Sequence, residues 1–347
     1  MAAINATTKD FPSLMDAVKG NPGALEKKVL EGVLAESPVF GKLPQRVIDG
    51  VSYRYKERMS IPLIGARPAN AGIKPFKSDY VLKKGECYIY NGAFQVDKAV
   101  AIAYPEDYGT MMEDEARAGV RGLLFNLERS LFYGKAISEY GMHGLPDTIG
   151  DYMTFSMDSS HNTDAQRQYG GASVWALSLK SDMLRVIWGK NKVLSFGPVK
   201  EESTNAKTAG GEDGSLTTLK REILAWVGFS QQHEGAVAHI VNESASKPLT
   251  DDALAQLVNL FPSGITPDII VMNRGTRAHL QTNRASSYKY VKGSSGKTPF
   301  ADIPTEFEGI PIVTTDALLA DETVQNIAAL AAQTKLTPIH NTGVLTR

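Results

Sequence analysis

Residues 105–135 read PEDYGTMMEDEARAGVRGLLFNLERSLFYGK, and this stretch decides the fold. Its apolar residues recur at intervals of three, four and one, which puts them on one face of a helix: Met112, Ala116, Val120, Leu123, Leu124, Leu127 and Leu131. Pro105 suits a first helical turn, and the acidic residues after it suit the positive end of the helix dipole. We expect a helix over residues 105–137, and even the part that ends near Lys135 would be about 45 Å long at roughly 1.5 Å per residue. Such a helix can serve as the spine of the molecule.

The segment before the helix, residues 51–104, is predicted to be a two-stranded excursion. Tyr53 and Tyr55 alternate with basic residues, Tyr88 and Tyr90 repeat this period of two, and residues 93–103 continue in a strand-like manner. Between these runs, glycines and prolines that interrupt regular strands predict an irregular tip: Gly65, Pro68, Gly72 and Pro75. An isolated hairpin is marginally stable in water, so a projecting one needs a partner surface.

Residues 1–50 carry two short helical patterns, at 11–18 and 22–35. Their apolar residues are too few to form a core. We therefore expect this segment to lie on another surface, as an N-terminal arm.

The sequence after the helix changes character near residue 249. Residues 160–248 favour strands at 174–179, 183–188 and 223–240, with an interruption rich in Gly, Ser, Thr and Asn at 203–215 that suggests a surface insertion. From residue 249 the pattern is α/β. Thr250 can cap a helix whose first turn holds two aspartates. Strands follow at 267–272 and 310–314, with helix at 276–281. The fold class is therefore α+β.

Composition narrows the function classes. The 37 basic residues are balanced by 38 acidic ones, whereas a protein that grips nucleic acid through phosphates needs a basic excess. No apolar run approaches the length of a membrane span, and the N-terminus has no secretory signal pattern. The single cysteine, Cys87, excludes an intramolecular disulfide and is expected to be a packing residue.

Motifs that would carry chemistry are incomplete. Gly296-Lys297-Thr298 resembles the end of a phosphate-binding loop, but Val291 stands where the first glycine is needed. His233 and His239 are six residues apart in a predicted strand, so they cannot share a metal as two histidines four apart on a helix do. We expect no catalytic, cofactor or metal residues. A catalytic site assembled from residues remote in sequence stays open.

The order of these segments resembles the major capsid proteins of tailed phages with the Hong Kong 97-type fold. The stretch Ser37-Pro38-Val39-Phe40-Gly41-Lys42-Leu43-Pro44 matches the arm that enters the family's extended loop, and Phe132-Tyr133-Gly134 with His143-Gly144-Leu145-Pro146 matches the junction after its spine helix. Further motifs are similar to the branch typified by the epsilon-fifteen phage: Ser173-Val174-Trp175-Ala176, Trp226-Val227-Gly228-Phe229, Ile240-Val241-Asn242, Leu249 to Leu254, Ile270 to Arg274 and Phe307 to Ile312.

This resemblance implies an arm at 1–50, an extended loop at 51–104, a peripheral domain at 105–248, an axial α/β domain at 249–320, and a C-terminal extension at 321–347 that would return to the peripheral domain. It implies a structural protein that self-assembles as hexamers and pentamers into the icosahedral head shell, in the host cytoplasm, and is found in the virion. The shell would enclose double-stranded DNA without sequence-specific binding. A decoration protein, portal and scaffold are further partners, and no membrane is involved.

Opposite charges on two segments fit the overlap of loop and neighbouring spine that the resemblance implies. Residues 52–98 hold nine basic and four acidic side chains, a net +5, and residues 106–115 hold five acidic and no basic ones. The predicted inter-subunit contacts are Arg54, Lys56, Arg58, Arg67, Lys74, Lys77, Lys83, Lys84, Glu106, Asp107, Glu113, Asp114 and Glu115. Both segments could instead be solvated faces, and the helix dipole explains part of the acidic bias.

Two other functions compete. An encapsulin-type compartment would share the fold but house cargo enzymes. An α/β enzyme with an unrecognised site would be a monomer or small oligomer with a polar pocket.

Overall fold

The computed structural model describes residues 37–58, 60, 62–73, 75–103, 108–158, 170–180, 183–190, 193–207, 211–288 and 302–333. The helical patterns at 11–18 and 22–35 lie outside these residues. The described chain builds two six-stranded sheets and a separate two-stranded sheet, arranged around one long helix.

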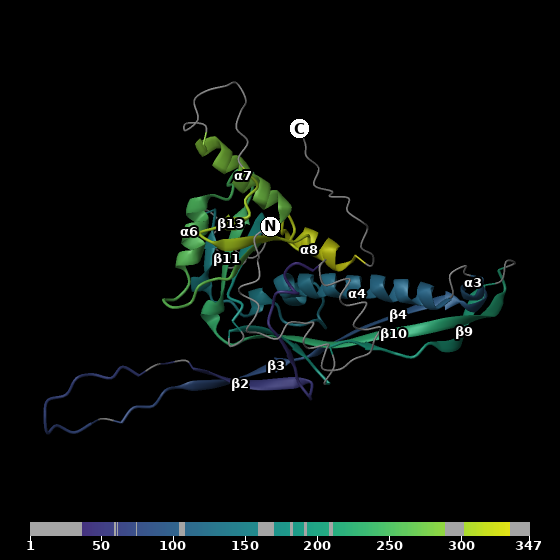
Figure 1. Cartoon of the computed structure of the whole chain (residues 1–347), viewed down its shortest axis with the longest axis horizontal. Helices are drawn as coiled ribbons and strands as arrows, with labels where there is room; N and C mark the ends of the chain where they lie inside the picture. The colour runs from purple at the N-terminus through teal and green to yellow at the C-terminus, as the bar shows by residue number, and fades with distance from the viewer. Residues whose placement is uncertain are drawn as a thin grey trace.

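The first sheet carries the long helix. Its strands run in the order β1 (Gln45–Val47), β7 (Leu184–Trp188), β10 (Asp213–Gln231) and β4 (Tyr88–Asp97), while β8 (Ser195–Phe196) and β9 (Lys200–Lys207) also pair with β10. Helix α4 (Tyr108–Tyr133) lies along β4 and β10 in Figure 1. Val120, Leu124 and Leu127 of α4 share a buried cluster with Ile223 of β10. Gly119 permits this close approach, because a Cβ there would lie 2.8 Å from the Ile223 Cδ1 atom. The predicted spine helix is confirmed.

The spine helix ends at Tyr133, four residues before the predicted end. Gly134 has φ +55°, and a Cβ at this position would lie 2.8 Å from the Gly144 amide nitrogen. Because a glycine can adopt this conformation in this space, the chain leaves the helix through a single 3₁₀ turn, Gly134–Ala136. The predicted start, residues 105–107, lies outside the described residues.

The second sheet has the order β13 (Glu306–Phe307), β14 (Ile310–Thr314), β12 (Ile269–Met272), β6 (Ala172–Leu177), β11 (Val237–Glu243) and β5 (Thr154–Ser156). Helices α6 (Asp251–Asn259), α7 (Arg274–Tyr288) and α8 (Val324–Ala331) accompany it. The predicted cap is confirmed, since the Thr250 hydroxyl accepts a hydrogen bond from the Ala253 amide at 3.1 Å. Strands β6 and β11 precede residue 249 and pair in the same sheet as β12 and β14, so a boundary between residues 248 and 249 does not separate two sheets.

The third sheet is the hairpin of β2 (Ser52–Arg58) and β3 (Tyr80–Glu86), which projects from the body in Figure 1. The excursion is therefore shorter than predicted, because Tyr88 and Tyr90 belong to β4 and pair with β10. The strand-like reading of residues 93–103 was wrong beyond residue 97. There the Asp97 carboxylate accepts from the Ala99 amide at 2.9 Å and begins the short helix α3 (Lys98–Ile102).

The predicted interruption at 203–215 is largely regular structure. Residues 200–207 and 213–220 pair antiparallel, with Ser203 opposite Thr217 and Asp213 opposite Lys207. Side chains reinforce the pairing, as the hydroxyls of Thr204 and Thr218 lie 3.1 Å apart. Polar composition misled the prediction because both faces of this hairpin carry polar residues.

Several residues in the segment 37–47 pack into the core. Val39, Phe40 and Leu43 are buried, and the Phe40 ring meets Trp188 edge to face at 6.1 Å. Part of the segment expected as a thin arm is thus anchored in its own subunit.

Candidate assembly surface

The base of the β2–β3 hairpin is fixed to the first sheet. A Cβ on Gly228 would lie 2.1 Å from the Glu86 carbonyl oxygen, and one on Gly85 would lie 2.9 Å from the Ile187 Cδ1 atom. Gly228 therefore lets the main chain at the end of β3 lie in backbone contact with the sheet, and Gly85 leaves room for the Ile187 side chain. The Tyr55 hydroxyl also donates to the Gln231 carbonyl oxygen at 2.8 Å. Main-chain and side-chain contacts together hold the hairpin in one direction.

The tip of the hairpin exposes large apolar side chains. Beyond the β2–β3 ladder, the exposed fractions are 97% for Leu63, 79% for Ile64, 77% for Ile73 and 62% for Phe76. Within the described residues, β2 and β3 pair only with each other. An isolated two-stranded hairpin is marginal in water, and clustered exposed apolar residues mark interaction sites. The tip has the properties of a surface that a partner covers.

The predicted basic residues of the loop are spread along the hairpin. Arg54, Lys56, Arg67 and Lys77 are exposed, and Lys83 is half-buried. Lys84 pairs with Glu86 of its own strand at 2.6 Å, so its charge is partly offset. Lys74 and the Arg58 side chain lie outside the described positions.

The predicted acidic residues sit at the other end of the molecule. Asp114 and Glu115 are exposed at the start of α4, Glu113 is half-buried, and Glu106 and Asp107 lie outside the described residues. Figure 1 shows the β2–β3 loop and the α3 end of the spine at opposite ends of the long axis. A single chain therefore does not bring the two charged groups together.

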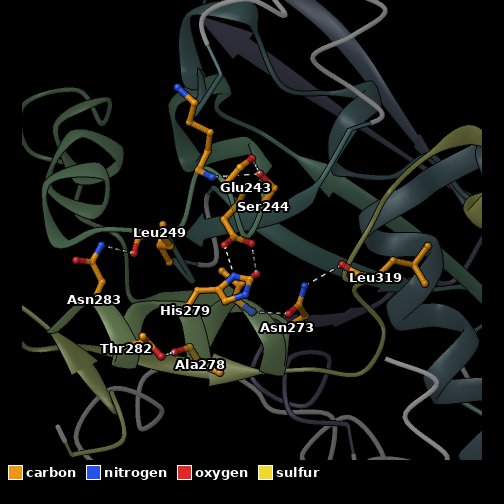
Figure 2. A network of polar contacts seen from close by, with 12 residues as sticks. Glu243, Ser244, Leu249, Asn273, Ala278, His279, Thr282, Asn283 and Leu319 are labelled. Carbon is orange, nitrogen blue, oxygen red and sulfur yellow. Dashed lines mark hydrogen bonds and ion pairs between the residues drawn. The ribbon is translucent and has the colours of Figure 1, made fainter. Parts of the chain in front are cut away.

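Sequence reasoning missed three buried carboxylates. Figure 2 shows the one on Glu243, at the end of β11, beside His279 of α7. The Glu243 carboxylate accepts from the Thr276 hydroxyl at 2.8 Å and lies 2.6 Å from the His279 Nδ1 atom. Asn273 extends the network, because its Oδ1 accepts from the Thr276 amide at 2.8 Å and its Nδ2 donates to the Leu319 carbonyl at 2.9 Å.

The network joins three segments of the chain. The Thr276 hydroxyl donates to the Glu243 carboxylate, and the His279 ring lies against the same carboxylate. Together with the two bonds of Asn273, these contacts tie β11, α7 and the segment after β14 into one unit.

The second buried carboxylate, Glu322, joins three segments. Its oxygens accept hydrogen bonds from the hydroxyls of Ser173 and, at 3.0 Å, Tyr133. Tyr133 in turn accepts from the Leu319 amide at 2.8 Å. Burial raises the pKa of Glu322 to about 7, although the hydroxyl donors oppose the shift.

The third, Glu128, attaches the residues before β1 to the spine. Its carboxylate accepts from the Ser37 hydroxyl at 2.7 Å. Burial raises its pKa above the ordinary value. No sequence pattern marks these acids as buried, although Glu128 lies near the apolar stripe of α4.

Cys87 is half-buried, His239 is buried and His233 is exposed. Burial raises the pKa of the Cys87 thiol to about 11, as expected of a packing residue. His239 is buried and stacks on Trp175 with centroids 3.6 Å apart, and burial lowers its pKa to about 3. His233 Nδ1 accepts from the Gly235 amide at 3.0 Å. Residues 296–298 lie outside the described part of the chain.

The described residues contain no group of three His, Cys, Asp or Glu side chains placed to hold a metal ion. They also contain no helix with the length and apolar character needed to cross a bilayer.

Comparisons with known proteins now bear on the identity of the chain. The family model described as major capsid protein GP7 matches residues 48–326. No curated protein matches. Among solved structures, that of bacteriophage Epsilon15 superposes with a TM-score of 0.60 at 16% identity, covering 81% of this chain and 87% of that chain.

Two further solved structures are more distant. The bacteriophage JBD30 capsid gives a TM-score of 0.47 at 14% identity over 79% of this chain and 88% of that chain. The encapsulin complex from Synechococcus elongatus gives 0.37 at 9% identity over 57% and 85%.

Proposed function

Because this chain belongs to the major capsid protein GP7 family, we propose that its β2–β3 loop lies across the spine helix of a neighbouring copy and closes the shell. The family and the fold shared with the Epsilon15 structure make the chain a structural capsid protein of the Hong Kong 97-type fold. The encapsulin alternative is not favoured, because the matching family model is that of a major capsid protein. A capsid protein is found in the virion.

One observation carries the proposal. The loop is a two-stranded hairpin whose base is fixed and whose tip exposes Leu63 almost fully. Covering a Leu or Ile side chain is worth about 1.5–3 kcal/mol. Each neighbouring copy that covers a tip would gain this burial energy. A closed shell contains many such contacts, and contacts that are individually weak stabilise the shell when they act together.

Charge would set the register of this contact. The loop carries the exposed Arg54, Lys56 and Lys77, and the neighbour's spine would present Asp114 and Glu115. Exposed ion pairs add about 0–1 kcal/mol each, so their main effect would be on orientation and on the rate of association.

The peripheral body would comprise the first sheet and α4, and the axial body the second sheet with α6 and α7. The axial bodies would gather around the axes of pentamers and hexamers of an icosahedral shell assembled in the host cytoplasm. The shell would enclose double-stranded DNA without sequence-specific contacts, in keeping with the net charge of −1. A portal, a scaffold and a decoration protein would join it. We also propose that the chain has no catalytic activity.

Charge reversal tests the loop-over-spine contact. The variant Glu113→Lys, Asp114→Lys, Glu115→Lys should give folded subunits by circular dichroism but few or aberrant particles by negative-stain microscopy. Adding Arg54→Glu, Lys56→Glu and Lys77→Glu to the same chain should restore part of the normal particles, because opposite charges again face each other. Normal shells from the first variant would eliminate the electrostatic part of the proposal.

A further inference from the structure

A second exposed apolar surface lies at the end of the molecule opposite the loop tip. Val100 and Ile102 of α3 are 53% and 70% exposed, and Ala99 and Ala103 beside them are also exposed. Apolar residues exposed singly are common on proteins, but here they occupy one short helix. Helix α3 and Ala103 after it therefore expose several apolar side chains to solvent.

Helix α3 is firmly held. The Asp97 carboxylate caps its first turn, and Lys98 pairs with Glu201 of β9 at 2.8 Å. On its inner side Ala101 is buried in a cluster with Met112 of α4 and Leu219 of β10. The exposed side chains thus stand on a positioned element whose opposite face is already packed.

The acidic residues of the spine begin at the same end of the molecule. Met112, which shares a buried cluster with Ala101 of α3, immediately precedes Glu113, Asp114 and Glu115. The α3 end of the molecule therefore combines exposed apolar side chains with the exposed Asp114 and Glu115. The loop tip combines apolar Leu63, Ile64, Ile73 and Phe76 with the exposed Arg67 and Lys77. The two ends match in apolar character and are opposite in charge.

We infer that α3 is the receiving site for the apolar loop tip of a second copy of this chain. The inference rests on the proposed function and extends it. Burial of Val100 and Ile102 would supply most of the contact energy, and the acidic and basic side chains around the contact would orient the two copies. Since the tip and α3 lie at opposite ends of one chain (Figure 1), the contact is heterologous and repeats from copy to copy. A ring closes if the rotation between copies returns to the start.

Other exposed apolar residues provide a control for this assignment. Val324, at the start of α8, is 63% exposed, close to the value for Ile102. It lies at the other end of the spine, because neighbouring Glu322 bonds to Tyr133, the last residue of α4. Because Val324 is similarly exposed but lies elsewhere, it serves as a matched control position for the α3 assignment.

Cross-linking within assembled particles tests the inference. In a Cys87→Ala background, which has no other cysteine, Ile64→Cys is combined with Ile102→Cys or with Val324→Cys. Particles are confirmed by microscopy, treated with a short bismaleimide and analysed on denaturing gels. The Ile64→Cys, Ile102→Cys pair should lose most of its monomer band to a ladder of dimers and larger oligomers. The Val324→Cys pair and each single variant should keep it.

The outcomes separate this inference from the proposed function. Intact particles in which the Ile102→Cys pair cross-links no more than the single variants would overturn the α3 assignment and leave the shell function standing. Efficient cross-linking of the Val324→Cys pair would overturn it as well and would identify the other site. If the Cys87→Ala parent and the native chain both form no particles, the proposed function fails and the inference fails with it.

Discussion

Replacing Glu322 with glutamine should remove a pH dependence that the native subunit carries in its core. The carboxyl is buried between Tyr133 of α4 and Ser173 of β6, and burial raises its pKa to about 7 from the ordinary value of 4.5. In the unfolded chain the group ionises near the ordinary value. Between the two values the unfolded state has lost its proton and the folded state has kept it. Stability is therefore fully present below about pH 4.5 and falls as the pH rises to about 7.

The size of this effect follows from the two pKa values. They differ by roughly 2.5 units, and each unit corresponds to about 1.36 kcal/mol, which gives a loss on the order of 3 kcal/mol. Glutamine keeps a carbonyl acceptor for one hydroxyl, and the other hydroxyl can rotate to accept from the amide.

The assay is urea unfolding of the unassembled, full-length subunit from pH 4.5 to pH 8, for the native chain and for Glu322→Gln. The difference between the two unfolding free energies cancels the other titrating groups, including Glu128. It should shift by about 3 kcal/mol in favour of the variant as the pH rises. A difference that stays constant across this range would rule out a raised pKa for Glu322 in the folded subunit.

Three further changes have defined outcomes. Gly228→Ala should displace the hairpin base, because its Cβ would lie 2.1 Å from the Glu86 carbonyl oxygen; we expect about 1–3 kcal/mol of destabilisation in urea and reduced particle yield. His239→Phe should flatten the acid side of the stability profile. Since burial lowers the His239 pKa to about 3, the native chain should lose about 2 kcal/mol between roughly pH 6.5 and 5, and an unchanged slope in the variant would count against this. Thr250→Ala should cost about 1 kcal/mol through loss of the α6 cap, measured by thermal or urea unfolding, while Thr250→Ser should cost much less.

The sequence predicted best those elements whose pattern is local. The apolar stripe from Met112 to Leu131 identified the spine, because helical periodicity depends only on neighbours along the chain. The Thr250 cap and strand 310–314 followed from similarly local signals. The end of the spine was less accurate, because Gly134 is required by the approach of Gly144, ten residues later.

Pairing between distant segments could not be predicted in this way. Tyr88 and Tyr90 have the same alternation as Tyr53 and Tyr55, so periodicity alone could not show that the former pair with β10. Likewise, the polar hairpin formed by β9 and β10 has no apolar alternation to mark it.

The candidate site was predicted in part. Charge counting identified the loop and the start of the spine, and the contact between them stays a prediction. The apolar side chains at the tip and on α3 were overlooked, since exposure depends on how the chain folds and cannot be read from residue type. The buried Glu128, Glu243 and Glu322 were missed for the same reason.

A cryo-electron microscopy reconstruction of particles formed by this chain would show the loop contact itself. We expect residues 62–79 of each copy to lie over the α3 end of the spine of an adjacent copy, with Leu63 and Ile64 covered. Particles in which this loop is folded against its own subunit, or a chain that stays a single copy at high concentration, would contradict it.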